Sequence, residues 1–190
     1  ANTYTGATTI STGVLNIQHA TATGTTAGGV SVTSGAALEI QGGITVGAEA
    51  LTLNGTGVSS GGALRNISGT NSMSGAITLG SAARINSDSG TLTLTGGTTG
   101  AGLALTVGGS GSTTVSTSGI NTSTSGTLTK DGTGTLTITA TGDYTGATTV
   151  SAGILNIQNA TATGTTAGGV SVTSGAALEI QGAITVGAEA

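Results

Sequence analysis

The feature that most constrains the fold of this 190-residue chain is a long internal repeat. Residues 4–50 return as residues 144–190, and only five of the 47 positions differ: Ile10/Val150, Thr12/Ala152, Val14/Ile154, His19/Asn159 and Gly43/Ala183. All five changes are modest, as packed or turn positions tolerate. The 140-residue period makes residues 4–143 one unit and residues 144–190 the start of the next, within one continuous segment, 1–190. We expect the chain to be an excerpt from a longer array.

A shorter rhythm runs through the 140-residue unit. Short segments in which Leu, Ile or Val alternate with small polar residues read as strands, with Gly-rich or Ser/Thr-rich turns between them. These segments are 14–17, 30–32, 38–40, 51–53, 64–67, 77–79, 92–94, 103–107, 128 and 136–138. Two or three of them make a turn of roughly 20–25 residues, the length expected of a β-helical rung. Each unit is then predicted to hold six or seven rungs and to advance about 30 Å.

The composition favours a β-helix over a β-sandwich. Thr (42), Gly (37), Ala (26) and Ser (20) supply two thirds of the chain, which has no Phe, Trp, Cys or Pro. A sandwich about 10 Å thick usually needs bulky fillers, whereas Leu, Ile, Val and Ala can fill a narrow coil. Pro would remove a donor from a sheet that continues above and below, so its absence fits as well. The predicted fold class is therefore all-β, a parallel β-helix (β-solenoid), and an array of β-sandwiches is the alternative.

Residues 126–157, GTLTKDGTGTLTITATGDYTGATTVSAGILNI, carry a recognisable motif. It resembles the autotransporter-associated β-helix repeat found in passenger domains of bacterial type V secretion proteins. The matching positions are Leu128, Lys130, Gly132, Gly134, Leu136, Ile138, Tyr144, Gly146, Thr148, Val150, Gly153 and Leu155. The resemblance implies a right-handed parallel β-helix exported to the cell surface, usually a stalk or adhesin, without catalytic residues.

The charge and apolar content exclude several classes of partner. With only Arg65, Arg84 and Lys130 as cations, and Tyr4 and Tyr144 as the only aromatics, the chain lacks the basic stripe and stacking platform of nucleic-acid binders. No apolar run reaches the roughly 18–20 residues that span a bilayer, so we expect no membrane insertion by this segment. The absence of Cys excludes disulfides and thiolate metal sites, and is compatible with export in an unfolded state.

The few acidic residues do not form a pattern that indicates catalysis. They are Glu39, Glu49, Asp88, Asp131, Asp143, Glu179 and Glu189. A polysaccharide-cleaving site needs clustered carboxylates, and Glu39 and Glu49 could stack on adjacent rungs. Because the last two acids merely repeat these two, we interpret them as solvated charges of strand faces and turns. We predict no enzyme activity and no catalytic, cofactor-binding or metal-binding residues.

The motifs also disfavour a calcium site, a site built on histidine and an ice-binding surface. Calcium-binding β-rolls need an Asp after Gly-Gly-x-Gly-x, and no Gly-Gly pair here supplies it. The single His, His19, is Asn159 in the second copy and is interpreted as a turn residue. Thr-x-Thr segments at 91–93, 127–129 and 135–139 resemble ice-binding surfaces, but such a surface needs one fixed phase on successive rungs. Residues 15–17, 38–40 and 64–67 are expected to interrupt it, so ice binding is disfavoured.

The leading hypothesis is a structural protein: a repetitive, extracellular β-helix that forms a cell-surface stalk or fibre, associated with the outer membrane. The expected partner is the chain itself, stacked end to end as a homopolymer or a long array. The alternative is an adhesin whose Thr/Ser/Asn-rich face contacts glycans or cells through many weak bonds. No cofactor is expected.

Overall fold

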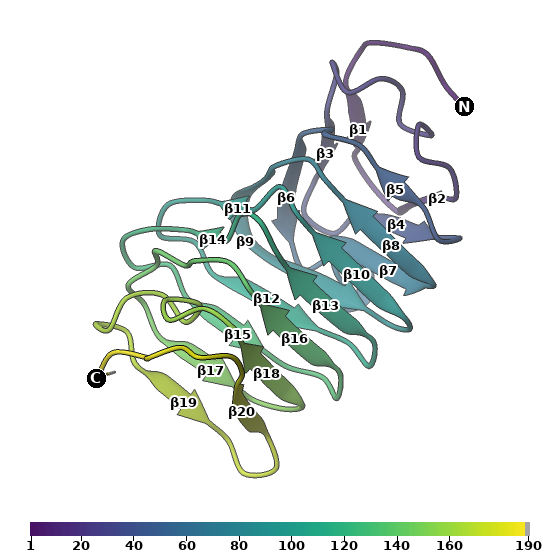
Figure 1. Cartoon of the computed structure of the whole chain (residues 1–190). Helices are drawn as coiled ribbons and strands as arrows, with labels where there is room; N and C mark the ends of the chain where they lie inside the picture. The colour runs from purple at the N-terminus through teal and green to yellow at the C-terminus, as the bar shows by residue number, and fades with distance from the viewer. Residues whose placement is uncertain (189–190) are drawn as a thin grey trace.

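The computed structural model describes residues 1–188 and is a single coil of parallel strands (Figure 1). Within each stack a strand pairs with the strands one turn earlier and one turn later, the first and last strands having one neighbour, and the coil makes about eight turns. Among the described residues the helical content is one short 3-10 turn, η1 (Val58–Ser60). The predicted all-β, parallel β-solenoid is therefore confirmed.

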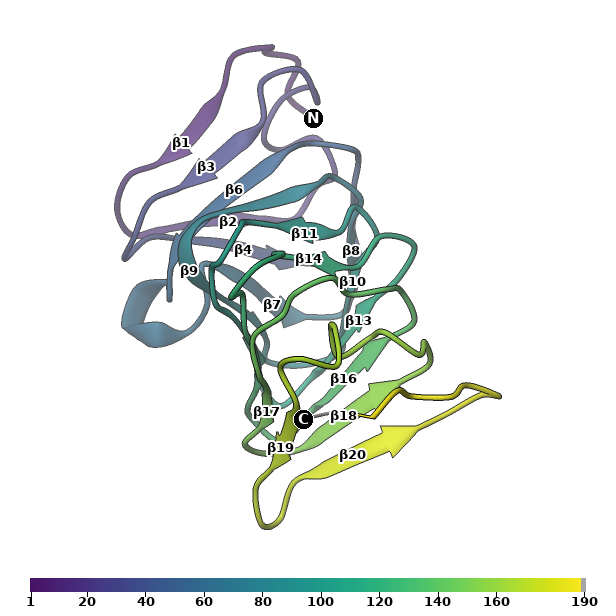
Figure 2. The same cartoon turned by 90° about the vertical axis from the view of Figure 1, so that its left-hand side faces the viewer.

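The strand pairings form three stacks, which we call sides one, two and three (Figure 2). Side one contains β1 (Thr8–Ile10), β3 (Val30–Val32), β6 (Leu51–Gly55), the beginning of β9 (Ile77–Ser87), β11 (Thr98–Thr99) and β14 (Ile120–Asn121). Side two contains β2 (Val14–Ile17), β4 (Ala37–Gln41), β7 (Leu64–Ser68), the end of β9, β12 (Leu105–Gly108), β15 (Leu128–Lys130), β17 (Thr148–Val150) and β19 (Val170–Val172). Side three contains β5 (Thr45–Val46), β8 (Thr70–Met73), β10 (Thr91–Leu94), β13 (Ser112–Val115), β16 (Thr135–Ile138), β18 (Ile154–Ile157) and β20 (Ala177–Ile180).

The core is a set of single-file columns along the coil. Because side chains alternate across a strand, one residue in two points inward and meets its register partner on the next turn. On side two one inward column reads Leu15, Leu38, Leu64, Ile85, Val107, Lys130, Val150 and Val172. On side three one reads Val46, Met73, Leu94, Val115, Ile138, Ile157 and Ile180. Aliphatic side chains fill most of this narrow interior, as the composition predicted, and the two largest fully buried side chains are Tyr144 and Lys130.

Turn length varies more than the sequence indicated. Val30 pairs with Thr8, 22 residues away, but Ile77 pairs with Leu51, 26 residues away, because the turn after β6 makes an excursion that includes η1. The sequence also missed β8 and β13, since their inward residues include the polar Asn71 and Thr113.

The sequence repeat does not coincide with a whole number of turns. Ile10 and Val150 are equivalent in the two copies, yet Ile10 lies on side one and Val150 lies on side two, in the column that begins at Leu15. Similarly, β2 lies on side two and its equivalent β18 on side three. One 140-residue unit therefore advances by six turns plus one side, which agrees with the predicted six to seven rungs. The second copy is consequently rotated about the coil axis by one side relative to the first.

Candidate functional site

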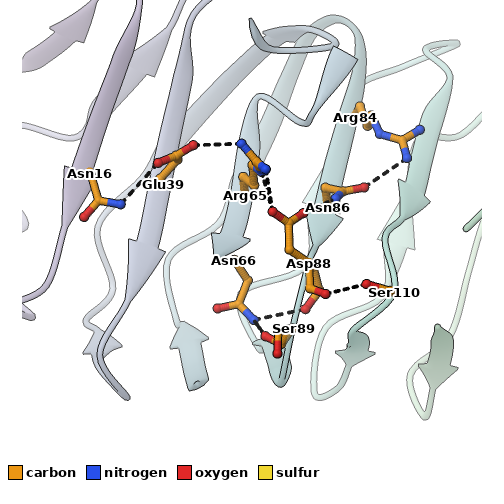
Figure 3. Close-up of polar contacts among 10 residues, drawn as sticks. Asn16, Glu39, Arg65, Asn66, Arg84, Asn86, Asp88, Ser89 and Ser110 are labelled. Carbon is orange, nitrogen blue, oxygen red and sulfur yellow. Dashed lines mark hydrogen bonds and ion pairs between the residues drawn. The ribbon is translucent and has the colours of Figure 1, made fainter. Parts of the chain in front are cut away.

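A ladder of polar and charged side chains, which we call the charge ladder, crosses the outer surface of side two (Figure 3). Asn16, Glu39, Arg65 and Asn86 are register partners on four successive turns. Asn16 Nδ2 donates to Glu39 Oε2 at 3.2 Å, and Arg65 Nη1 donates to Glu39 Oε1 at 3.0 Å. Arg65 Nε donates to Asp88 Oδ2 at 2.8 Å. The hydrogen bond to Asp88 raises the pKa of the Arg65 guanidinium, although partial burial opposes the shift.

The ladder continues across a turn that contributes no side chain. Arg84 Nη1 and Nη2 donate to the two Asp131 carboxylate oxygens at 2.7 and 2.8 Å, two turns further along the coil. The guanidinium passes over Gly108, the register partner of Asn86. A Cβ at Gly108 would lie 1.9 Å from Asp131 Oδ1 and 2.4 Å from Arg84 Nη2. Glycine at this position leaves the space that the bidentate pair occupies, and a larger residue would displace the ends of both side chains.

The third cation lies inside the coil. Lys130 is 2% exposed and stands in the aliphatic column of side two between Val107 and Val150. Its ammonium reaches the corner after β15 and donates to the carbonyls of Asp131 (2.6 Å), Gly132 (2.9 Å) and Ala152 (3.2 Å). Desolvation lowers the pKa of Lys130, against the opposing charge of Asp131. The lysine of the recognised motif thus bridges the carbonyls of two successive turns.

The structure separates the two acids that the sequence placed on adjacent rungs. Glu39 lies in the charge ladder, whereas Glu49 accepts a hydrogen bond from Thr23 Oγ1 elsewhere on the coil. The interpretation of Glu49 as a solvated charge is wrong, because its side chain is buried and only 3% exposed. Asp143 accepts from the Ser123 backbone N–H at 2.9 Å, and Glu179 accepts from Asn156 Nδ2 at 3.1 Å. Glu189 lies outside the described residues. Among residues 1–188 no three His, Cys, Asp or Glu side chains gather as a metal ion would require.

The two copies show that His19 has a turn role. His19 Nδ1 accepts from the Thr21 backbone N–H at 3.2 Å, and Asn159 Oδ1 accepts from the Thr161 backbone N–H at 3.0 Å. The two side chains make the same local contact. The interpretation of His19 as a turn residue is confirmed.

Side three presents a regular outer array of hydroxyls, which we call the hydroxyl face. Four successive strands, β8, β10, β13 and β16, each place two Thr or Ser residues outward in register. The eight residues are Thr70, Ser72, Thr91, Thr93, Ser112, Thr114, Thr135 and Thr137. Within residues 1–188, none of these eight hydroxyls has a hydrogen-bond partner. This face carries no charge and its polar groups remain open to an external ligand.

The hydroxyl face corrects one argument from the sequence. Residues 15–17, 38–40 and 64–67 were expected to interrupt the Thr-x-Thr phase, but they lie in β2, β4 and β7 on side two. On side three the outward Thr or Ser phase is unbroken over four turns, because strands of both other sides lie between successive strands of this side. The Thr-x-Thr segment at 127–129 lies instead on side two, at β15.

A shallow depression lies beside β1 and β3. It measures about 170 Å³ and is lined by Ala7, Gly28, Gly29, Val30, Ser31, Ala50 and Thr52. Ligand pockets usually exceed about 300 Å³ and converge polar groups on the ligand. This depression has no ionisable side chain in its lining, so it does not constitute an active site.

Comparison with known proteins supports the resemblance seen in the motif. The model of the passenger-associated-transport-repeat matches residues 1–17 and 128–157. These two segments, of 17 and 30 residues, are similar to this passenger repeat. The matched segments contain β1, β2 and β15–β18, so the passenger repeat includes both Lys130 and its carbonyl acceptors. No curated protein and no solved structure matches the chain. Within residues 1–188 there is no helix with the length and apolar character needed to cross a membrane.

Proposed function

We propose that this chain is a rigid spacer of an exported surface protein, a stalk or fibre segment of an autotransporter passenger. The passenger repeat and the β-solenoid fit such a domain. The observation that carries the proposal is the inward column from Leu15 to Val172, which links eight consecutive turns by parallel pairing without a break. Stiffness in such a coil comes from continuity between neighbouring turns and not from any single residue.

Rod length measures this role directly. A 140-residue unit advances six turns and one side, which corresponds to about 30 Å at the spacing of paired strands. Residue 51 follows residue 50 in the first copy, so appending residues 51–190 after Ala190 continues the repeat in phase. Electron microscopy of chains with zero, one and two such additions should show straight rods that lengthen by about 30 Å each time. Compact or flexible particles whose length does not scale with unit number would refute the spacer role.

We further propose that the chain has no catalytic function. The charge-ladder carboxylates of Glu39, Asp88 and Asp131 are each paired with an arginine, so this ladder offers no free carboxylate pair for acid–base chemistry. Turnover of a polysaccharide by the purified chain that is lost in Glu39→Gln would contradict this proposal.

The hydroxyl face favours a second candidate function, adhesion to a polysaccharide through many weak hydrogen bonds. The eight open hydroxyls lie in two rows along the coil. Each hydrogen bond to a polysaccharide adds little binding free energy, but together they form a multivalent surface. Paired Thr93→Lys and Thr114→Lys substitutions should abolish retention of the chain on an insoluble polysaccharide. Thr149→Lys, an outward residue of side two, is the matched control and should retain binding. Equal behaviour of both variants would rule out the hydroxyl face.

The predicted self-association fits the same scheme. If units follow one another in register, each successive unit is rotated by one side, so that the charge ladder and the hydroxyl face point in three directions along the stalk. A stalk built in this way presents the charge ladder and the hydroxyl face on all three of its sides.

A further inference from the structure

One of the two rows of the hydroxyl face continues onto a fifth turn. Thr45 of β5 is the register partner of Ser72, and within residues 1–188 its hydroxyl has no hydrogen-bond partner. The four strands of the face, β8, β10, β13 and β16, each pair with a strand on both sides (Figure 1). The longer row therefore runs over five successive turns: Thr45, Ser72, Thr93, Thr114 and Thr137.

The parallel pairing sets the dimensions of this array. Register partners on successive turns lie about 4.8 Å apart along the coil, and the two outward residues of one strand lie about 6.6 Å apart across it. The two directions are close to perpendicular, because the strands run across the axis of the coil (Figure 1). The hydroxyls therefore form a rectangular grid that repeats from turn to turn.

The side chains of the grid are held in place before any ligand arrives. Most of them are Thr, whose β-branched side chain has a restricted χ1 angle. The strands beneath them pack on the buried column of Met73, Leu94 and Val115. A surface that is already ordered loses little conformational entropy when it binds. Such a grid favours a ligand whose own surface is equally regular.

The chemistry of the face restricts the ligand further. The strands β5, β8, β10, β13 and β16 contain no charged and no aromatic residue. Sites for small molecules are usually concave and lined by apolar and aromatic side chains, and this sheet face provides neither feature. It offers hydroxyl groups, which both donate and accept hydrogen bonds, and the methyl groups of Thr. The matching ligand is uncharged and carries donors and acceptors at regular intervals in two directions.

We propose that the hydroxyl face, together with Thr45, binds ice. The oxygen atoms on the prism face of hexagonal ice repeat in two perpendicular directions. The shorter repeat is close to the spacing of the turns, and the longer one is close to the spacing of the two outward residues along a strand. The strands at 15–17, 38–40 and 64–67 lie on side two and leave the grid unbroken. Each contact is weak, so the affinity depends on several turns of the grid binding together.

Ice affinity can be measured directly on the isolated chain. Ice is grown slowly from a dilute solution, and the protein concentration in the ice is compared with that in the remaining liquid. We expect the original chain to be enriched in the ice. The double variant Thr93→Lys with Thr114→Lys should lose this enrichment, because two charged side chains in the centre of the grid keep the ice surface away. Thr129→Lys with Thr149→Lys, register partners on the outer surface of side two, is the matched control and should remain enriched.

Ice binding and polysaccharide adhesion compete for the same face, and the same variants separate them. Circular dichroism establishes that each variant is folded, and Ser112→Lys on this face replaces the double variant if that chain does not fold. Exclusion of the original chain from ice, or equal enrichment of the face variant and the control, would overturn the proposal. Retention on an insoluble polysaccharide without enrichment in ice would assign the face to adhesion and would also overturn it. The spacer role is tested separately by rod length.

Discussion

Ile40 and Ile180 provide a controlled test of how a turn is stabilised by the turn that follows it. They occupy the same position in identical local sequences and differ in cover: Ile40 is fully buried under β7, while Ile180 is 58% exposed. Ile→Ala at a fully buried site costs about 2–5 kcal/mol, from lost transfer free energy plus the cavity left behind. We therefore expect Ile40→Ala to lower the free energy of unfolding by about 3 kcal/mol.

Ile180→Ala should cost much less. More than half of the side chain already contacts water, and within residues 1–188 no turn lies above it to enclose a cavity, so we expect a loss below about 1 kcal/mol. Urea unfolding in dilute solution, followed by circular dichroism, measures both variants against the original chain. Ile40→Val, expected to cost about 0.5–1.5 kcal/mol, provides a milder variant if Ile40→Ala does not fold. Equal costs at the two positions would refute the assignment of stability to contacts between neighbouring turns.

Three further predictions concern the polar contacts. Gly108→Ala should separate Arg84 from its carboxylate partner and lower the free energy of unfolding by about 1–2 kcal/mol, measured by urea unfolding. Lys130→Met should cost about 1–3 kcal/mol, because buried carbonyls lose their donor. Burial lowers the pKa of Lys130 in the folded chain, so the unfolded chain binds the lysine proton more tightly. The contribution of Lys130 to the free energy of unfolding should therefore increase as pH rises from this lowered pKa towards about 10.4, the value of a free lysine. His19→Asn should change stability by less than about 0.5 kcal/mol, since Asn159 makes the same turn contact.

Each of these has a matched control. Gly6→Ala introduces the same methyl group where nothing lies within 4 Å and should be close to neutral, so an equal effect at both glycines would contradict the crossing of Arg84 over Gly108. In Lys130→Met the alkaline gain in stability should disappear, and its persistence would assign the gain to another group. His19→Ala should be more destabilising than His19→Asn if the turn contact is what matters.

The sequence alone was enough to determine the class of fold and its repeat. Leu, Ile and Val at alternate positions, between frequent glycine turns, specify short strands with one dry face. The scarcity of aromatic residues, two Tyr in 190 residues, favours a narrow coil as the interior. The strands at 14–17, 30–32, 92–94 and 136–138 were predicted for this reason. Local alternation of side chains is a property of the chain itself, so it can be read without knowing what each strand contacts.

Only the tertiary structure decided which strands stack on one another. The side occupied by a strand depends on the summed length of all preceding turns, and one long excursion, such as the one containing η1, shifts the phase. That phase rotates the second copy by one side, aligns Thr91, Thr114 and Thr137 with their neighbours on the hydroxyl face, and brings Arg84 to Asp131 across Gly108. These contacts join residues at least one turn apart, so no local pattern specifies them. They are set by the total number of residues in the turns that lie between the two partners.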